Sequence, residues 1–381
     1  MTVAAPERIL IVKLADLGDA LLATPAIRAL RLAFPAARLD ALTTVNGAAA
    51  LALSPNLNRI VTFPKELFDR PAGIVHPRRG ALLGRLAVEL RASRYDAVIL
   101  LHHLTTGFGA LKFRALVAAT GAPIRAGLDN GLGTFLTHRA PDYGFGPSPE
   151  WRYALDVVAL LGATTEPVGP AIAVPDPSRA SADKALEGAG VDGSFVVIHP
   201  SVGAFSPART WPLERFVAVT RRLRADLGTH VVAVGSADDS AAGRALGAAG
   251  AVDLTGRTTL AEVAALIERS GLVIGCDSGI VHLAGMLGRP LVAIFGPSNA
   301  GAWRPIGAVE HRVGRRPFPD ASAIVVRAGI PCSPCFYVGY GLGRREGCRV
   351  KTCLSLVTPE EVGEAALHLL RRQVSVAERD R

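Results

Sequence analysis

The sequence has no uninterrupted apolar run of about 18 or more residues, the length that a membrane-spanning helix requires. We therefore expect no transmembrane helix. The first residues, MTVAAPERILIVKLADLGD, also lack a basic stretch followed by a longer apolar run, so the sequence predicts no secretory signal peptide. Together these two absences predict a cytoplasmic protein.

Aromatic residues are scarce, at 6% of the chain, and the arginines form no stripe interleaved with them. This composition argues against nucleic-acid binding. A dinucleotide fingerprint is missing as well. Where G-x-G-x-x-G would have to follow the first predicted strand, only Gly18 is present. An NAD-linked oxidoreductase is therefore disfavoured.

What the chain does have is an excess of positive charge, with 42 Lys and Arg against 33 Asp and Glu. Arginine predominates over lysine, which suits bidentate contacts with phosphate or carboxylate, although GC-rich coding produces the same bias. An anionic small substrate or an anionic membrane surface fits this charge better than DNA. We therefore expect an anionic partner other than a nucleic acid. Peripheral association with the inner membrane is one way in which the protein would meet such a partner.

Short β-branched runs alternate with helical patterns in two blocks, which predicts an α/β protein with parallel sheets covered on both faces. The predicted strands lie at 8–14, 38–44, 59–64 and 95–102, and then at 195–200, 230–236, 251–256, 272–277 and 290–297. Between the blocks, the proline-punctuated 164–178 is predicted to be a linker. We expect Rossmann-like domains at 1–170 and 171–357. A final helix in 358–381, capped by Thr358, is expected to pack back towards the first domain.

Asp19 stands at the first predicted strand-to-helix turn. Ligands of open parallel sheets sit beyond the carboxyl ends of the strands, so a carboxylate there would be well placed to deprotonate a hydroxyl. The alternative is a helix N-cap, a common role for aspartate at such a turn.

In the second block, FVVIHPSVGAFSPARTWPLERF runs from a strand into a small polar loop. Ser201 and Arg209 there suit phosphate oxygens, through a hydroxyl and a neutralising charge. Arg209 is alternatively a solvent-exposed arginine beside a proline helix start. In VAVGSADDSAAGRAL, Ser236 and Asp238 suit ribose hydroxyls, and Asp238 is equally plausible as a helix cap.

The segment GLVIGCDSGIVHLAGMLGRPLVAIFGP gives the strongest of these signals. A buried strand ends at Asp277, and a helix is predicted to begin at Ser278 and Gly279. Its free N–H groups and positive dipole end form an anion site. His282, one turn into the helix, is interpreted as a ligand contact, the alternative being a packing histidine.

These motifs together resemble glycosyltransferase family 9, the ADP-heptose heptosyltransferases of the lipopolysaccharide inner core. The resemblance rests on ILIVKLADLGDALLATPAIRAL, IHPSVG with ARTWPLERF, DLTGRTTLAEVAALI, and D-S-G-x-x-H followed by a strand ending in F-G-P. It covers essentially the whole chain.

The resemblance implies a GT-B fold of two Rossmann-like domains facing a cleft, with acceptor on the first domain and donor on the second. It implies an inverting, single-displacement transfer of a heptose or similar sugar from an ADP-sugar to a glycan hydroxyl, without a catalytic metal or other cofactor. Asp19 matches the general base. The matching donor residues are Ser201, Arg209, Asp277, Ser278, Gly279 and His282. Arginine stands at 209 where many members carry lysine, and a monomer is expected.

Four cysteines cluster near the end of the chain in C-x2-C and C-x4-C pairs: Cys332, Cys335, Cys348 and Cys353. Four thiolates in a glycine-rich loop suit a structural zinc or iron ion. Related autotransporter heptosyltransferases hold iron with such a cluster, by resemblance. Reduced, unliganded thiols are the alternative.

An acceptor site is expected around 63–80, where Arg70, Arg78 and Arg79 suit an anionic glycan such as lipopolysaccharide core, although they equally suit a solvated face. Other functions remain open at this point. One is a non-catalytic nucleotide-sugar or phosphoglycan-binding protein, which would have no reason to keep Asp19. Another is a family 9 enzyme with a different donor, or with a protein or small-molecule acceptor.

Overall fold

The computed structural model of the protein describes residues 5–65, 77–203 and 206–379, and it divides into two compact units, Met1–Ala173 and Val174–Arg381. The boundary lies three residues beyond the predicted one. Residues after 170 stay with the first unit because the Ala173 N–H donates to the Leu53 carbonyl at 2.8 Å and Asn56 Nδ2 donates to the Ala171 carbonyl at 3.5 Å.

The first unit is built on a parallel sheet with the strand order β3-β2-β1-β4-β5-β6. Its strands are β1 Arg8–Lys13, β2 Arg38–Thr43, β3 Arg59–Thr62, β4 Ala97–Leu100, β5 Ile124–Asp129 and β6 His138–Pro141. The four central runs are apolar and almost wholly buried, as strands covered on both faces must be. This is the order of a doubly wound dinucleotide-type fold.

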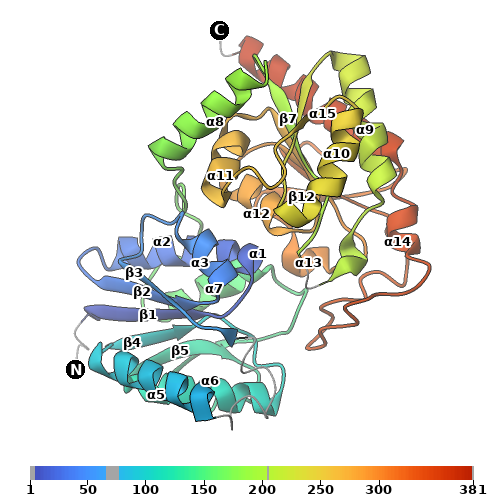
Figure 1. Ribbon diagram of the computed structural model, residues 1–381. Helices are drawn as coiled ribbons and strands as arrows, with labels where there is room; N and C mark the ends of the chain where they lie inside the picture. Colours follow the sequence, from blue (N-terminus) through green and yellow to red (C-terminus); the bar gives the residue numbers. More distant parts are fainter. Residues whose placement is uncertain (1–4, 66–76, 204–205, 380–381) are drawn as a thin grey trace. The chain divides into compact units, whose positions relative to one another are not determined.

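Helices cover both faces of this sheet (Figure 1), with α1, α2, α3 and α7 on one side and α5 and α6 on the other. Their bounds are α1 Leu17–Leu22, α2 Thr24–Ala33, α3 Val45–Leu51, α5 Pro77–Ala92, α6 Gly107–Thr120 and α7 Glu150–Ala159. The helical stretch that follows β1 consists of two helices, α1 and α2, and Pro25 lies in the first turn of α2.

The second unit repeats the plan with seven parallel strands in the order β12-β13-β11-β10-β7-β8-β9. They are β7 Phe195–His199, β8 His230–Ala233, β9 Val252–Asp253, β10 Leu272–Cys276, β11 Leu291–Ile294, β12 Ala308–Arg312 and β13 Ala323–Arg327. The five predicted strands of this block are therefore confirmed. Two further strands, β12 and β13, extend the sheet.

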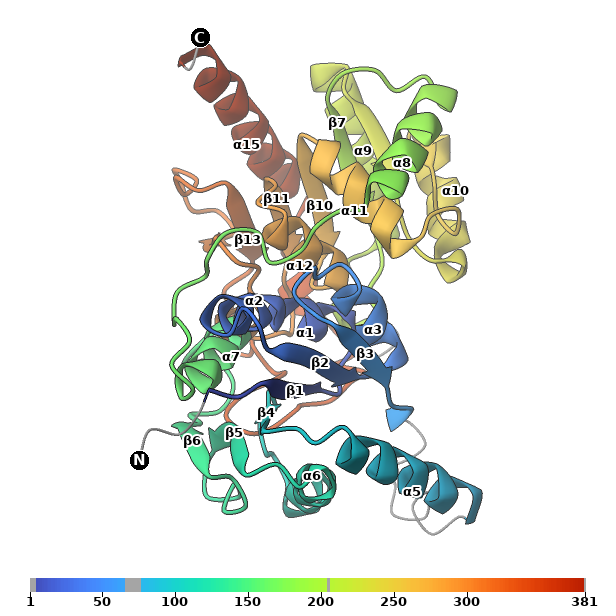
Figure 2. The same ribbon diagram turned by 90° about the vertical axis from the view of Figure 1, so that its left-hand side faces the viewer.

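The helices of the second unit are α8 Asp176–Gly188, α9 Leu213–Leu227, α10 Ser240–Ala248, α11 Leu260–Arg269, α12 Gly279–Met286, α13 Ala300–Trp303, α14 Thr352–Ser355 and α15 Pro359–Arg379, with short 3-10 turns at Pro207–Arg209 and Ala237–Asp239. Figure 2 shows α8 beside α11. Thr259 and Glu262 form the capping box that starts α11. Gly228, at φ 61°, ends α9 in the left-handed conformation that glycine adopts readily.

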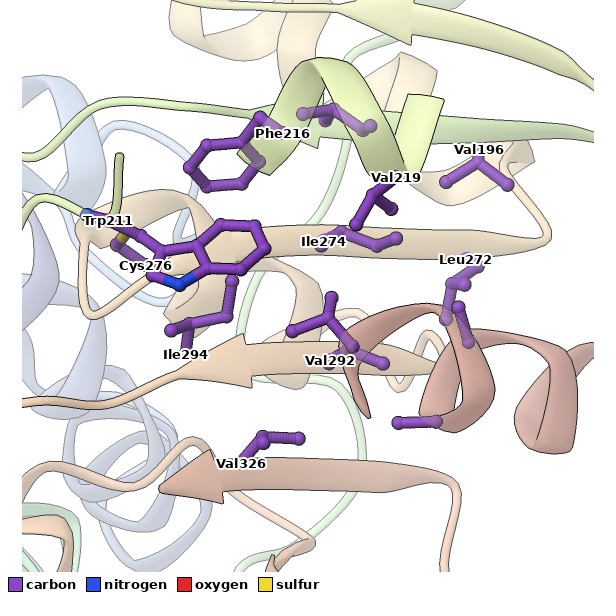
Figure 3. Close-up of a cluster of buried hydrophobic side chains, with 14 of the residues drawn as sticks. Val196, Trp211, Phe216, Val219, Leu272, Ile274, Cys276, Val292, Ile294 and Val326 are labelled. Carbon is purple, nitrogen blue, oxygen red and sulfur yellow. The ribbon is translucent and has the colours of Figure 1, made fainter. Parts of the chain in front are cut away.

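The core of this unit gathers between the sheet and the helices α9 and α15. Figure 3 shows Trp211 and Cys276 packed among branched side chains of β10 and β11. The Trp211 indole N–H donates to the Val357 carbonyl at 2.9 Å, so the buried ring leaves no polar atom unsatisfied. Burial raises the pKa of the Cys276 thiol to about 12, as expected of a small core residue.

Thr358 caps α15 as predicted, accepting from the Glu361 N–H at 3.3 Å. Helix α15 belongs to the second unit. Its apolar stripe, spaced one helical turn apart, is buried in that unit's core at Val362, Ala365, Ala366 and Leu369. Among the described helices, none has the length and apolar character needed to cross a bilayer.

Candidate functional site

In each sheet the strand order reverses beside the first strand of the unit, and Asp19, Ser201, Arg209 and the 277–282 motif follow strands that flank these points. In the first unit the reversal lies between β1 and β4, and in the second between β7 and β10. Loops leaving the two strands in opposite directions open a crevice at the carboxyl end of the sheet, where doubly wound proteins bind ligands.

Asp19 is the third residue of α1, directly beyond β1, and is half-buried. The N-cap position of this helix belongs to Asp16, so the capping role considered for Asp19 is wrong. A carboxylate in the first turn of a helix interacts favourably with the helix dipole.

Neighbouring strands hold the loop between β1 and α1 in place. Thr43 Oγ1 donates to the Lys13 carbonyl at 2.7 Å, and Thr44 Oγ1 donates to the Ala15 carbonyl at 2.6 Å. From the other side, the Leu14 N–H donates to His102 Nε2 at 2.6 Å. Three hydrogen bonds from both flanking strands thus fix the backbone that leads into Asp19.

Two adjacent histidines after β4 have opposite charge states. Burial, reinforced by the charges of Lys13 and Lys65, lowers the pKa of His102 well below its ordinary value, so the ring is neutral and can accept from Leu14. Burial would also lower the pKa of His103, but hydrogen bonds to Asp142 at 2.8 Å and Glu150 at 2.9 Å outweigh it and raise this pKa to about 9. His103 is therefore a buried imidazolium that ties β4 to the start of α7.

In the second unit, Arg209 lies beside Asp277. Its guanidinium donates to Asp277 Oδ2 at 3.3 Å, and His282 Nε2 lies 3.8 Å from the other carboxylate oxygen. Burial would raise the pKa of Asp277, but the charge of Arg209 and the contact with His282 hold it at about 2. An ionised Asp277 thus positions the arginine and the histidine, and both side chains are largely buried.

The helix α12 begins at Gly279, next to this ion pair, and Ser278 is its N-cap residue. The Ser278 side chain makes no capping hydrogen bond, and its hydroxyl lies 3.1 Å from His199 Nδ1 instead. His282 Nδ1 is buried and has no hydrogen-bond partner among the described residues. The open N–H groups of the first turn, the arginine and this nitrogen together can receive an anion.

Ser236 and Asp238 lie in the loop after β8, and both are exposed. Asp238 is not a helix cap: Asp239 occupies the N-cap position of α10, and its Oδ2 accepts from the Ser236 N–H at 2.7 Å and from the Ser236 hydroxyl at 2.8 Å in the capping box of the preceding 3-10 turn. That leaves Asp238, and not its neighbour, as the carboxylate open to a ligand.

The four clustered cysteines are all free thiols; Cys353 is buried and the other three are exposed. Burial and the neighbouring thiols raise the pKa of Cys335, and raise that of Cys353 to about 11. In the described part of the chain no group of three or more Cys, His, Asp or Glu residues is arranged to hold a metal ion. The geometry therefore does not fit the zinc or iron site expected from the spacing, and we derive no step through a metal.

Of the arginines assigned to the acceptor, Arg70 lies outside the described residues. Arg78 and Arg79 fall in the first turn of α5, where the described side chains begin at Gly80.

With this geometry established, the chain was compared with known proteins. The family described as glycosyltransferase family 9 (heptosyltransferase) matches residues 83–327, well over half of the chain. This protein belongs to glycosyltransferase family 9. It is thus a heptosyltransferase-like glycosyltransferase, as the motifs from KLADLGD to IFGP predicted.

Relatives agree with this family. The chain is 27% identical to lipopolysaccharide heptosyltransferase 3 of Escherichia coli over 302 residues, 76% of this chain and 83% of that one. Its fold is similar to a family 9 glycosyltransferase from Veillonella parvula (TM-score 0.73, 24% identity, 98% and 99% coverage). It is also similar to the E. coli ADP-heptose lipopolysaccharide heptosyltransferase II (TM-score 0.67, 22% identity, 96% and 99% coverage). The predicted GT-B fold is confirmed by these matches.

Proposed function

We propose that this family 9 enzyme transfers a heptose, or a similar sugar, from an ADP-sugar to a hydroxyl group of an anionic glycan such as lipopolysaccharide core. The observation that carries the proposal is the second unit's anion site, where Arg209, ionised Asp277 and the unpartnered nitrogen of His282 surround the open start of α12. A diphosphate bridging nucleoside and sugar is the anion that this family's donors present. The heptosyltransferase II named above supports ADP-heptose as the donor.

In the proposed reaction Asp19 accepts the proton of the acceptor hydroxyl as the oxygen attacks the anomeric carbon. The bond from that carbon to the diphosphate breaks, ADP leaves with the bonding electrons, and the configuration inverts. Negative charge grows on the leaving diphosphate, where Arg209 and the first N–H groups of α12 would stabilise it. Arg70, Arg78 and Arg79 remain the proposed contacts for the acceptor's negative charges. Ser201, Ser236 and Asp238 remain the proposed contacts for the donor's phosphate and ribose.

A donor screen tests this function. The full chain is mixed with ADP-heptose, UDP-glucose, GDP-mannose or CMP-sialic acid, and both thermal unfolding and sugar transfer to a core oligosaccharide are measured. A donor at about 100 times its Kd stabilises the native state by about 2.7 kcal/mol, so the true donor should stand out. We expect ADP-heptose to do so. If only a sugar of another nucleotide stabilised the protein against thermal unfolding, that nucleotide-sugar would be the donor instead of ADP-heptose. Binding of ADP-heptose with no transfer to any acceptor would favour the non-catalytic alternative.

We further propose that the first unit docks on an anionic membrane through the outer faces of α5 and α6. These helices contact each other and expose the large apolar side chains Leu82, Val88, Phe108 and Leu111. Val88 is 70% exposed and Leu111 59% exposed. Basic residues flank them at Arg85, Arg91, Lys112 and Arg114, and Glu89 is the one acid on the described side chains of the two helices. Apolar groups inserted beneath a basic rim suit an anionic bilayer surface.

Replacing Leu111 by Glu should reduce co-sedimentation with phosphatidylglycerol-containing vesicles several-fold, because it places a negative charge in the centre of the apolar face. Leu356→Glu is the matched control, since that leucine is 46% exposed in the second unit. Equal binding by the two variants, or no binding by the parent protein, would rule this surface out.

A further inference from the structure

His199, the last residue of β7, was not singled out by the sequence, yet its ring joins two elements of the donor site. Its Nδ1 lies 3.1 Å from the Ser278 hydroxyl, and the Ser201 hydroxyl lies 3.2 Å from its Nε2. Ser201 follows β7, and Ser278 follows β10, the neighbouring strand across the reversal of strand order. The imidazole thus bridges the two loops that flank the crevice.

The neighbouring strand packs closely against the backbone of His199. Gly275 lies opposite His199 in the paired strands, and a Cβ atom there would lie 3.1 Å from the His199 carbonyl oxygen and 3.6 Å from its Cβ. His199 itself is buried, and burial lowers its pKa to about 4. The ring is therefore neutral at physiological pH, with one N–H and one lone pair to share between the two serines.

A neutral bridge sets the direction of both hydrogen bonds. One serine hydroxyl must accept from the ring N–H, which leaves its own proton free to donate to a ligand. The other must donate to the ring lone pair, which leaves its oxygen free to accept. In addition, the Ser278 hydroxyl is held away from the backbone of α12, where an N-cap serine would ordinarily bond. The first N–H groups of the helix are left to an incoming anion.

We propose that His199 is a positioning residue for the donor diphosphate. By holding Ser201 and Ser278 it presents one hydroxyl as a donor and keeps the start of α12 open. The inference rests on the proposed function, because it assumes that a nucleoside diphosphate group occupies this site. His199 makes no contact with the ligand itself; it acts through the two serines.

Binding of ADP to the full chain, measured by calorimetry, tests the proposal. His199→Leu should raise the Kd for ADP about ten-fold, the scale of losing one or two hydrogen bonds. Ser201→Ala should raise it about five-fold. In the double variant the Kd should stay near ten-fold, because Ser201 has already lost its orientation; independent effects would multiply to about fifty-fold. His199→Gln, whose amide offers both a donor and an acceptor, should stay within about three-fold of the parent.

His368→Leu is the matched control, since it removes a half-buried histidine on α15, in the same unit, whose Nε2 lies 3.3 Å from the Pro319 carbonyl oxygen. It should bind ADP as the parent does, and thermal unfolding of each variant shows that it is folded. Fully multiplicative effects of His199→Leu and Ser201→Ala, or parent-like binding by His199→Leu, would overturn the proposal. A parent that binds no ADP would instead overturn the donor assignment, and the same four variants titrated with inorganic pyrophosphate would still decide the role of His199.

Discussion

Asp19→Asn is expected to lower the turnover number for sugar transfer by about 10²–10⁴-fold while the Kd for ADP stays near that of the parent. The amide keeps the size of the side chain but cannot take the acceptor's proton. The loop that leads into Asp19 is fixed by hydrogen bonds from Thr43, Thr44 and His102, so it should keep its course in the variant. Steady-state kinetics with saturating donor, together with calorimetry for ADP, measures both quantities.

Asp16→Asn supplies the matched control. Asp16 is the N-cap residue of the same helix, is exposed, and makes no capping hydrogen bond through its side chain. Its replacement removes the same charge three residues away and should leave turnover within a few-fold of the parent. If Asp19→Asn also retained turnover within a few-fold, Asp19 would not be the base. If both variants lost activity equally, the effect would be one of local charge rather than of proton transfer.

Most of the central strands could be predicted from the sequence because each is an apolar run with buried residues on both faces. The prediction missed the interior strands β5 and β13, and it missed β6 and β12 at the edges of their sheets. β6, His138–Pro141, carries exposed polar residues and a proline, and β12, Ala308–Arg312, alternates between buried and exposed positions. An edge strand is covered on fewer sides, so its sequence differs less from that of a loop.

The first three residues of helix α8 were interpreted as the end of the 164–178 linker because of the prolines there. Pro177 lies in the first turn of the helix, where the missing N–H costs nothing, and Pro175 precedes it as N-cap. A proline cluster therefore marks both a linker and a helix start, and the sequence alone does not separate the two.

The residues of the proposed anion site could be singled out from the sequence because they follow the strand ends in short, recognisable motifs. The two bridging histidines could not. His102 bonds to a residue 88 positions away, and His199 to one 79 positions away. Both contacts exist because β1 lies beside β4 and β7 beside β10. A histidine at the end of a buried strand looks like a packing residue until that strand order is known.

The Arg209–Asp277 pair leads to the second large effect. Arg209→Ala should weaken ADP binding by about 1.5–3 kcal/mol, or about 10- to 150-fold, if the guanidinium makes a charge-assisted hydrogen bond to the donor phosphates. Arg209→Lys should recover part of this loss, because it keeps the charge but not the fork of donors. Arg221→Ala, an exposed arginine on α9, removes the same charge elsewhere in this unit and should bind ADP as the parent does.

Removing Arg209 also leaves Asp277 buried with less compensation, so stability must be followed alongside binding. In the parent the pKa of Asp277 is held at about 2, below its ordinary 3.8. The stability that the ionised carboxylate contributes is therefore complete above about pH 4 and is lost only as the pH falls towards 2. Arg209→Ala removes the positive charge that opposes the effect of burial on Asp277. The pKa of Asp277 therefore rises in the variant, and acid unfolding should begin at a higher pH. If Arg209→Ala shows this shift in acid unfolding but binds ADP as the parent does, Arg209 stabilises the ionised Asp277 and does not contact the donor.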